Sequence, residues 1–179
     1  MADRSMLRRM GRAAILDSHV YEEVEADTTS IGQATVVVLL TCLSGSLGSW
    51  LSGHAPARVA IDLLEPLLFW LAGGAFTYMV GATFLRGPET VTSYREVLRT
   101  TGFAFTPGLL RIAAALPLFG LGFGITVLSD LWVLVAGVVA VRQALDFTTL
   151  RAVGTFGLSY LLLWLAFEGF LLELTRFVF

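Results

Sequence analysis

The sequence predicts an all-α protein: a polytopic membrane helix bundle of about five transmembrane helices, with short interfacial amphipathic helices beside them. Of the 179 residues, 56% are hydrophobic and 15% are charged, whereas soluble domains carry about 45–50% apolar and about 25% charged residues. The apolar residues gather in five long stretches, and a membrane-spanning helix needs about 20 of them. The loops between the stretches are too short for a separate folded domain, so the composition excludes a soluble enzyme.

Residues 1–30 are predicted to form a cytoplasmic segment that is first basic and then acidic. Arg4, Arg8 and Arg12 recur every four residues, the pattern of an amphipathic helix that lies in an anionic headgroup layer. The stretch 21–27 is rich in glutamate, and we expect it to face water or a partner. The segment has no apolar run long enough for a cleaved signal peptide.

Residues 31–179 are predicted to form the transmembrane domain. Its five apolar stretches cover 31–52, 63–85, 103–128, 131–145 and 152–174. Ser30 and Gln33 fit a capping box that starts the first span. Ser129 and Asp130 separate the third and fourth stretches, which predicts a tight helical hairpin with its turn at these residues. The stretch Leu131–Leu145 is short for a span, so a re-entrant hairpin, and hence four spans, is left open.

The segment 86–106 is predicted to be a second interfacial helix. Tyr94, Val97 and Leu98 share one helical face, and Arg95 and Arg99 fall on the opposite side. The two arginines are therefore candidates, with those of the first segment, for contact with the membrane surface or a partner.

The arginines also predict the orientation of the chain. Nine of the twelve fall before the first span, between the second and third, or beside the connection between the fourth and fifth. Short basic loops stay on the cytoplasmic side. We therefore expect a multi-pass protein of the cell (inner, cytoplasmic) membrane with a cytoplasmic amino terminus. Five crossings would place the carboxyl terminus outside, whereas four would keep both ends inside.

Of the charged residues inside the predicted spans, three are candidates for a functional role: Glu65, Arg111 and Glu168. Such residues are costly in a bilayer, so each is a functional hypothesis. The two glutamates lie near the outer ends of their spans, where they either line a polar pocket or reach headgroup water. Arg111 is expected one turn below the cytoplasmic surface, with its side chain reaching cytoplasmic phosphates. That position would be about 20 Å from either glutamate.

Small residues recur every four positions in stripes within the spans. The glycines of these stripes are Gly45, Gly48, Gly73, Gly81, Gly120 and Gly124. Such stripes let helix backbones approach closely. The sequence leaves open whether they pack helices of one chain or join two copies in a homodimer.

Other chemistry is not indicated. Cys42 is the one cysteine and lies in an apolar run, which excludes a disulfide framework and a cysteine-based zinc site. Neither His19 nor His54 has a second ligand at metal spacing. The net charge of −2 argues against nucleic-acid binding. No catalytic motif is found, and we expect no cofactor or metal, only bound lipid.

Several segments resemble the Yip-domain family, the five-span membrane proteins named for interaction with Ypt/Rab GTPases. The similar segments are Tyr21-Glu22-Glu23-Val24-Glu25-Ala26-Asp27 with Gln33-Ala34, then Ser93-Tyr94, Leu98-Arg99, Gly102-Phe103, Pro107 and Pro117, then Leu131-Trp132, Val141-Arg142-Gln143-Ala144-Leu145 and Arg151-Ala152. The resemblance covers about residues 15 to 165. It implies five helices with a cytoplasmic amino terminus, and eukaryotic members are linked to vesicle trafficking and membrane shaping. The chain departs from the family in lacking an Asp-Gly-Pro-like signature, so GTPase binding is not expected.

These observations predict a non-enzymatic integral membrane protein that acts in membrane organisation or as a protein-interaction scaffold. Its partners would be the lipid bilayer and other membrane proteins or a second copy of itself. Two alternatives remain open. One is an accessory subunit of a larger, energy-transducing membrane complex. The other is a small transporter or channel that uses Glu65 and Glu168.

Overall fold

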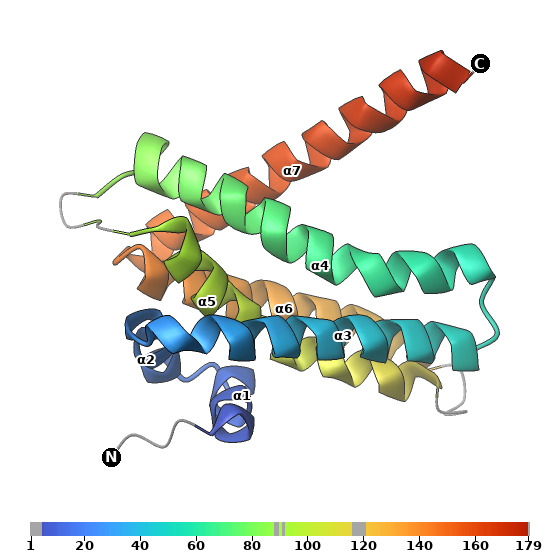
Figure 1. Ribbon diagram of the computed structural model, residues 1–179, viewed down its shortest axis with the longest axis horizontal. Helices are drawn as coiled ribbons and strands as arrows, with labels where there is room; N and C mark the ends of the chain where they lie inside the picture. The colour runs from blue at the N-terminus through green and yellow to red at the C-terminus, as the bar shows by residue number, and fades with distance from the viewer. Residues whose placement is uncertain (1–4, 88–89, 91, 116–120, 179) are drawn as a thin grey trace.

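A computed structural model of the chain describes residues 5–87, 90, 92–115 and 121–178, with side chains up to Phe167. The described part is all-helical, which confirms the predicted class (Figure 1). Its α-helices are α1 (Met6–Ala14), α2 (Ser18–Ala26), α3 (Ile31–Leu51), α4 (Pro56–Met79), α5 (Tyr94–Ala104), α6 (Gly122–Ala144) and α7 (Thr149–Val178). Short turns of other helix types add η1 (Thr28–Ser30), the π-helical η2 (Val80–Phe84) and the 3-10 helix η3 (Thr106–Ala115).

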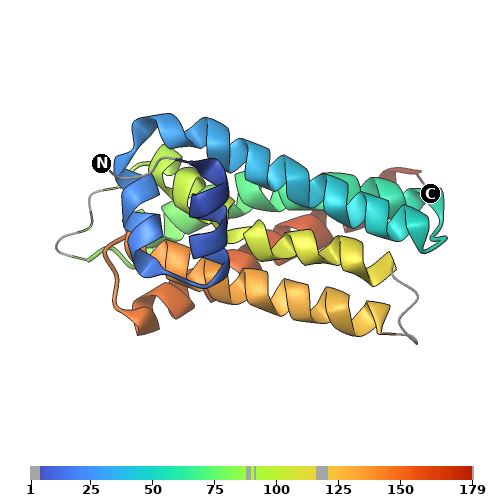
Figure 2. The same ribbon diagram turned by 90° about the horizontal axis from the view of Figure 1, so that it is seen from below.

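Within the described residues, four helices are long and apolar enough to cross a membrane. They cover Thr28–Leu51, Pro56–Phe84, Gly122–Ala144 and Thr149–Phe167. Beside these helices, α5 and η3 follow one another along α3 from the N-terminal end of the bundle to its far end (Figure 2), and we call this segment the third pass. The described part of the predicted third stretch, 103–128, is not one helix, because it covers the end of α5, the 10-residue 3-10 helix η3 and the beginning of α6.

The predicted hairpin turn at Ser129 and Asp130 is wrong. Both residues lie inside α6, a 23-residue helix, so the short arm Leu131–Leu145 is only the second part of a full-length helix. The chain reverses instead between Ala115 and Gly122. Serine and aspartate usually signal a turn in sequence. Here the Ser129 hydroxyl donates to the Pro107 carbonyl at 3.0 Å, so η3 supplies the partner that a turn or water would otherwise provide.

The predicted interfacial helix around Tyr94 is instead mostly buried. Every residue of α5 from Val97 to Ala104 is buried, because α5 packs against α2, α3, α4 and α6. A capping box that the sequence pattern did not single out starts this helix: Ser93 bonds the Glu96 amide, and the Glu96 side chain accepts from the Ser93 amide. The helix therefore belongs to the core of the N-terminal end.

The small-residue stripe of α3 packs against the third pass within the same chain. The Thr41 hydroxyl donates to the Phe105 carbonyl at 3.0 Å, and the Ser44 hydroxyl donates to the Leu109 carbonyl at 2.7 Å. At Gly48 an added Cβ would lie 2.6 Å from the Arg111 carbonyl oxygen. Small polar residues on α3 thus let a 3-10 helix lie close and satisfy its carbonyls.

The other predicted packing glycines differ in their surroundings. An added Cβ at Gly45 would meet the Arg111 side chain at 3.6 Å, and one at Gly81 would overlap the Leu145 side chain. At Gly73 the contact is looser, 3.8 Å to Leu163, and at Gly124 no atom lies within 4 Å. Gly120 lies outside the described residues. The stripes therefore serve packing within the chain at Gly45 and Gly81, while Gly124 is open.

Candidate functional site

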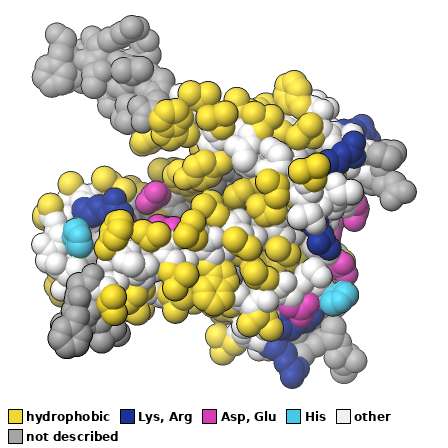
Figure 3. Space-filling view, turned by 180° about the vertical axis from the view of Figure 1, so that it is seen from behind, with side chains coloured by type: hydrophobic (Ala, Val, Ile, Leu, Met, Phe, Trp, Pro, Cys, Tyr) yellow, Lys and Arg dark blue, Asp and Glu magenta, His cyan; other side chains and the backbone are white. Residues whose placement is uncertain are grey.

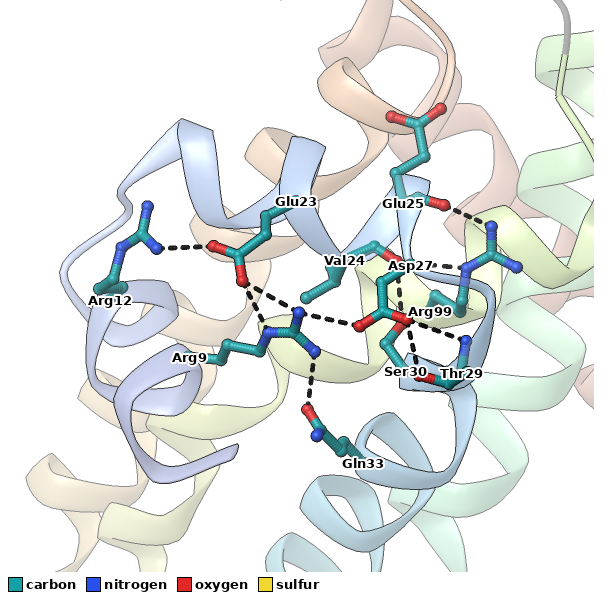
Figure 4. Close-up of polar contacts among 10 residues, drawn as sticks. All are labelled: Arg9, Arg12, Glu23, Val24, Glu25, Asp27, Thr29, Ser30, Gln33 and Arg99. Atoms are coloured by element: carbon teal, nitrogen blue, oxygen red, sulfur yellow. Dashed lines mark hydrogen bonds and ion pairs between the residues drawn. The ribbon is translucent and has the colours of Figure 1, made fainter. Parts of the chain in front are cut away.

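The two N-terminal helices lie across one end of the bundle, where the predicted basic helix and acidic stretch bind each other (Figure 4). Arg9 is 1% exposed. Its guanidinium donates to Glu23 at 3.0 Å, to Gln33 at 3.0 Å and to Asp27 at 2.9 Å. The expectation that the acidic stretch faces water or a partner is therefore wrong for Glu23 and Asp27, which hold α1 in place.

The arginines that were predicted to contact the membrane surface lie in different environments. Arg12 donates to Asp17 at 2.8 Å and to Glu23 at 2.9 Å, so its charge is used within the chain. Arg8 is exposed, and Arg4 lies outside the described residues. Leu7 is 72% exposed on the same helix. Contact between the membrane surface and the side of α1 that carries Leu7 and Arg8 stays a prediction.

Arg99 does not face a partner either. It is 5% exposed, and its guanidinium donates to the Val24 carbonyl at 3.2 Å and to the Glu25 carbonyl. These bonds satisfy carbonyls at the end of α2, where helices leave acceptors unpaired. Arg95, one turn earlier on α5, is exposed as predicted.

The loop between α2 and α3 differs from the predicted capping box. The Ser30 hydroxyl donates to the Val24 carbonyl at 2.8 Å and makes no cap to α3. Asp27 accepts from the Thr29 amide and hydroxyl. Hydrogen bonds from Thr29, together with Arg9, hold the pKa of Asp27 at about 2. By contrast, burial raises the pKa of Glu25 to about 7, with Asp146 and Glu96 adding to the rise.

A charged groove lies at the far end of the bundle, between α3, α4, η3 and α6. It encloses about 790 Å³. Its polar lining residues are Ser49, Ser52, His54, Arg58, Asp62, Glu65, Arg111, Thr126 and Asp130. Figure 3 shows acidic side chains in a hollow that is surrounded by hydrophobic surface. This is the main concentration of charge within the apolar part of the described chain.

Two ion pairs neutralise four of the charges in the groove. Arg58 and Asp62, one turn apart on α4, lie 2.8 Å apart, and Asp62 also accepts from the Ser49 hydroxyl. Arg111 of η3 and Asp130 of α6 lie 2.7 Å apart. Because a charge in an apolar setting is costly unless it is paired, these contacts make the groove tolerable in a bilayer.

The structure corrects the predicted place of Arg111. The third pass begins at Tyr94, 17 residues earlier than Arg111, and part of it is a 3-10 helix that rises about 2 Å per residue. Arg111 therefore lies toward the far end with Glu65, rather than one turn from the other surface. The expected distance of about 20 Å between Arg111 and Glu65 is therefore wrong, since the two residues line the same groove. The expectation that Arg111 reaches cytoplasmic phosphates is wrong for the same reason.

Glu65 is the third carboxylate of the groove. It is half-buried on α4, and among the described residues it has no hydrogen-bond or ion-pair partner. With the two ion pairs neutral, the described lining of the groove keeps one negative charge, at Glu65. The side chain of Glu168 lies outside the described residues, so the polar pocket that it was predicted to line with Glu65 stays a prediction.

An apolar chamber of about 180 Å³ adjoins the groove and shares Glu65, Arg111 and Asp130 with it. Its apolar and aromatic walls are formed by Phe69, Phe105, Val133, Leu134, Phe156 and Tyr160. The Phe69 and Tyr160 ring centroids are 5.7 Å apart. The two cavities together thus present a polar side and an aromatic side to one ligand.

Sequence reasoning missed Arg58, Asp62 and Asp130 as parts of this site. Asp62 was placed just outside a span and Asp130 in a turn. A usable signal was present: Arg58 and Asp62 are four residues apart on a helix, Arg111 lies within an apolar stretch, and Asp130 is an opposite charge beside the same stretch. Within the described part of the chain, no group of three or more His, Cys, Asp or Glu side chains is placed to hold a metal ion.

No family model, curated protein or solved structure matches the chain. The resemblance to the Yip-domain family therefore stays a prediction.

Proposed function

We propose that the chain is a non-enzymatic, multi-span membrane protein that organises the bilayer or partner membrane proteins around it. The observation that supports this role is the position of α7, which diverges from the bundle toward its carboxyl end (Figure 1). Its exposed apolar residues include Leu150, Val153, Leu158, Leu161, Trp164, Leu165 and Phe167. Gly154 and Gly157 have no other atom within 4 Å of an added Cβ. The helix thus offers an apolar face with room for a neighbouring helix.

We further propose five crossings of the cell membrane, with the amino terminus in the cytoplasm. The support is the third pass made by α5 and η3 and the bias of the arginines to one side. This architecture is also what the Yip-domain family implies, and membership of that family is part of the proposal.

The test is the size of the particle after purification in mild detergent. A homodimer supports the scaffold, and a stoichiometric complex with other proteins supports the accessory subunit. A monomer in both mild detergent and lipid nanodiscs contradicts either role. Gly154→Leu and Gly157→Leu should reduce the association of the chain with its partner. Gly32→Leu is the matched control, because Gly32 also has no atom within 4 Å but lies on α3.

A second candidate function is transport, and Glu65 favours it. A carboxylate facing a groove at membrane depth is typical of ion and proton pathways. Ion flux by the purified protein in liposomes, abolished by Glu65→Gln, would support transport. Equal flux through wild type and the variant would contradict a role of Glu65.

A further inference from the structure

We propose that the charged groove and the apolar chamber together bind a lipophilic organic cation, with its positive charge beside Glu65 and its apolar part in the chamber. This site goes beyond the membrane-organising role, and it does not require transport. Three properties of the described residues carry the proposal: the charge of the groove, the lining of the chamber and the access to both.

The charge of the groove selects a cation. The other charged residues that line the groove with Glu65 are Arg58 and Asp62 on the same helix, Arg111 on η3 and Asp130 on α6. The first two pair with each other, as do the last two. Glu65 therefore supplies the net charge of the described lining, and a ligand with one positive charge would neutralise it. Pro66 has no N–H to donate to the Asp62 carbonyl, which adds an acceptor oxygen on the same turn.

The lining of the chamber selects an apolar, preferably aromatic, ligand body. Phe69 and Tyr160 form a tilted ring pair beside Glu65, and Phe105 and Phe156 add two more rings. Aromatic faces attract organic cations by about 0.5–2 kcal/mol, most strongly where water is excluded. A small hydrated metal ion would gain little from such walls, and the described carboxylates do not converge as a metal site requires.

Access to the site suits a ligand that partitions into lipid. The groove opens as a hollow on the apolar surface (Figure 3). Its polar rim includes Ser52 and His54, near the turn between α3 and α4. A lipophilic cation collects in the bilayer close to the headgroups, and from there it would enter the groove sideways. An inorganic ion would have to reach the same place through water.

The experiment compares two probes of the same shape and opposite charge, tetraphenylphosphonium and tetraphenylborate. Each is titrated by equilibrium dialysis into the purified full-length chain in detergent, with protein-free micelles subtracted. We expect saturable binding of tetraphenylphosphonium that is at least about tenfold weaker in Glu65→Gln. Asp146→Asn is the matched control, since Asp146 is an exposed carboxylate at the other end of the bundle, and it should bind like wild type.

Three results would overturn the proposal. These are equal affinity of wild type and Glu65→Gln, equal binding of the two probes, and displacement of tetraphenylphosphonium by millimolar sodium or potassium. Glu65→Gln keeps the shape of the side chain, and a monodisperse elution profile shows that it folds. Phe69→Leu gives an independent check, because it keeps an apolar wall but removes a ring, and it should weaken binding without abolishing it.

Discussion

Arg9 should hold the N-terminal helices on the bundle. Its guanidinium is buried and binds three side chains: Glu23 on α2, Asp27 in the loop before α3, and Gln33 on α3. We predict that Arg9→Met, which keeps a long side chain but removes the charge, releases α1 and α2 from the bundle while the long helices stay folded.

The magnitude follows from the environment of its partners. Removing one partner of a buried ion pair costs about 3–5 kcal/mol, because the charge of the other partner is left unpaired. Here Glu23 is 21% exposed and keeps Arg12, and the Asp27 side chain is 10% exposed and keeps Thr29. The loss in free energy of local unfolding should therefore be lower, about 2–4 kcal/mol. Since 1.4 kcal/mol is a factor of ten, amide exchange in α1 and α2 should be about 30- to 1,000-fold faster.

Hydrogen exchange with mass spectrometry on the detergent-solubilised chain measures this effect. Peptides from 6–26 should gain deuterium faster in Arg9→Met, whereas peptides from α4, which does not pack against α1 or α2, should not change. Arg8→Met is the matched control, because Arg8 is the neighbouring arginine but is exposed, and an exposed charge contributes about 0–1 kcal/mol. Exchange in Arg9→Met that matches the Arg8→Met variant would refute the role assigned to the buried guanidinium.

Gly48→Ala should destabilise the bundle by about 1–3 kcal/mol, since an added Cβ would lie 2.6 Å from the Arg111 carbonyl oxygen. An added Cβ at Gly124 would lie in open space, so Gly124→Ala should be neutral or stabilising in thermal unfolding. Equal shifts of Tm in the two variants would contradict the close approach of α3 to Arg111. Glu25 has a folded pKa of about 7 against 4.5 for the free group, so the folded chain binds more protons between these values and loses stability as pH rises through them. Glu25→Gln should reduce this pH-dependent loss of stability by about 1 kcal/mol after allowance for screening. Identical pH profiles of Tm for wild type and Glu25→Gln would disprove this role of Glu25. A reporter fused after Phe179 should be extracytoplasmic, and a cytoplasmic signal would exclude five crossings.

The helical class and the apolar stretches could be predicted from the sequence because both depend on local composition. The apolar run predicted α3 to within a residue or so, whereas α4 begins at Pro56, seven residues before the predicted stretch. The segment 103–145 was divided wrongly because Ser129 and Asp130 look like a turn. A polar residue in a bilayer helix needs a partner, and that partner sits on another helix at long sequence separation.

The candidate sites depended on such long-range pairs, so the sequence could indicate the residues but not their roles. Arg8 and Arg9 are neighbours with the same chemistry, yet one is exposed and the other is buried against three acceptors. Spacing every four residues favoured Arg8 and left Arg9 out. Likewise, Arg111 was an isolated charge until the fold brought it to Asp130.

The two ends of the bundle use charge in different ways. At the N-terminal end, Arg9 and Arg99 bind carboxylates and carbonyls of the chain itself, so their charge stabilises the fold. In the groove, Glu65 has no such partner among the described residues, so its charge is left for a ligand. Glu65→Gln should therefore weaken the binding of tetraphenylphosphonium while the fold stays intact.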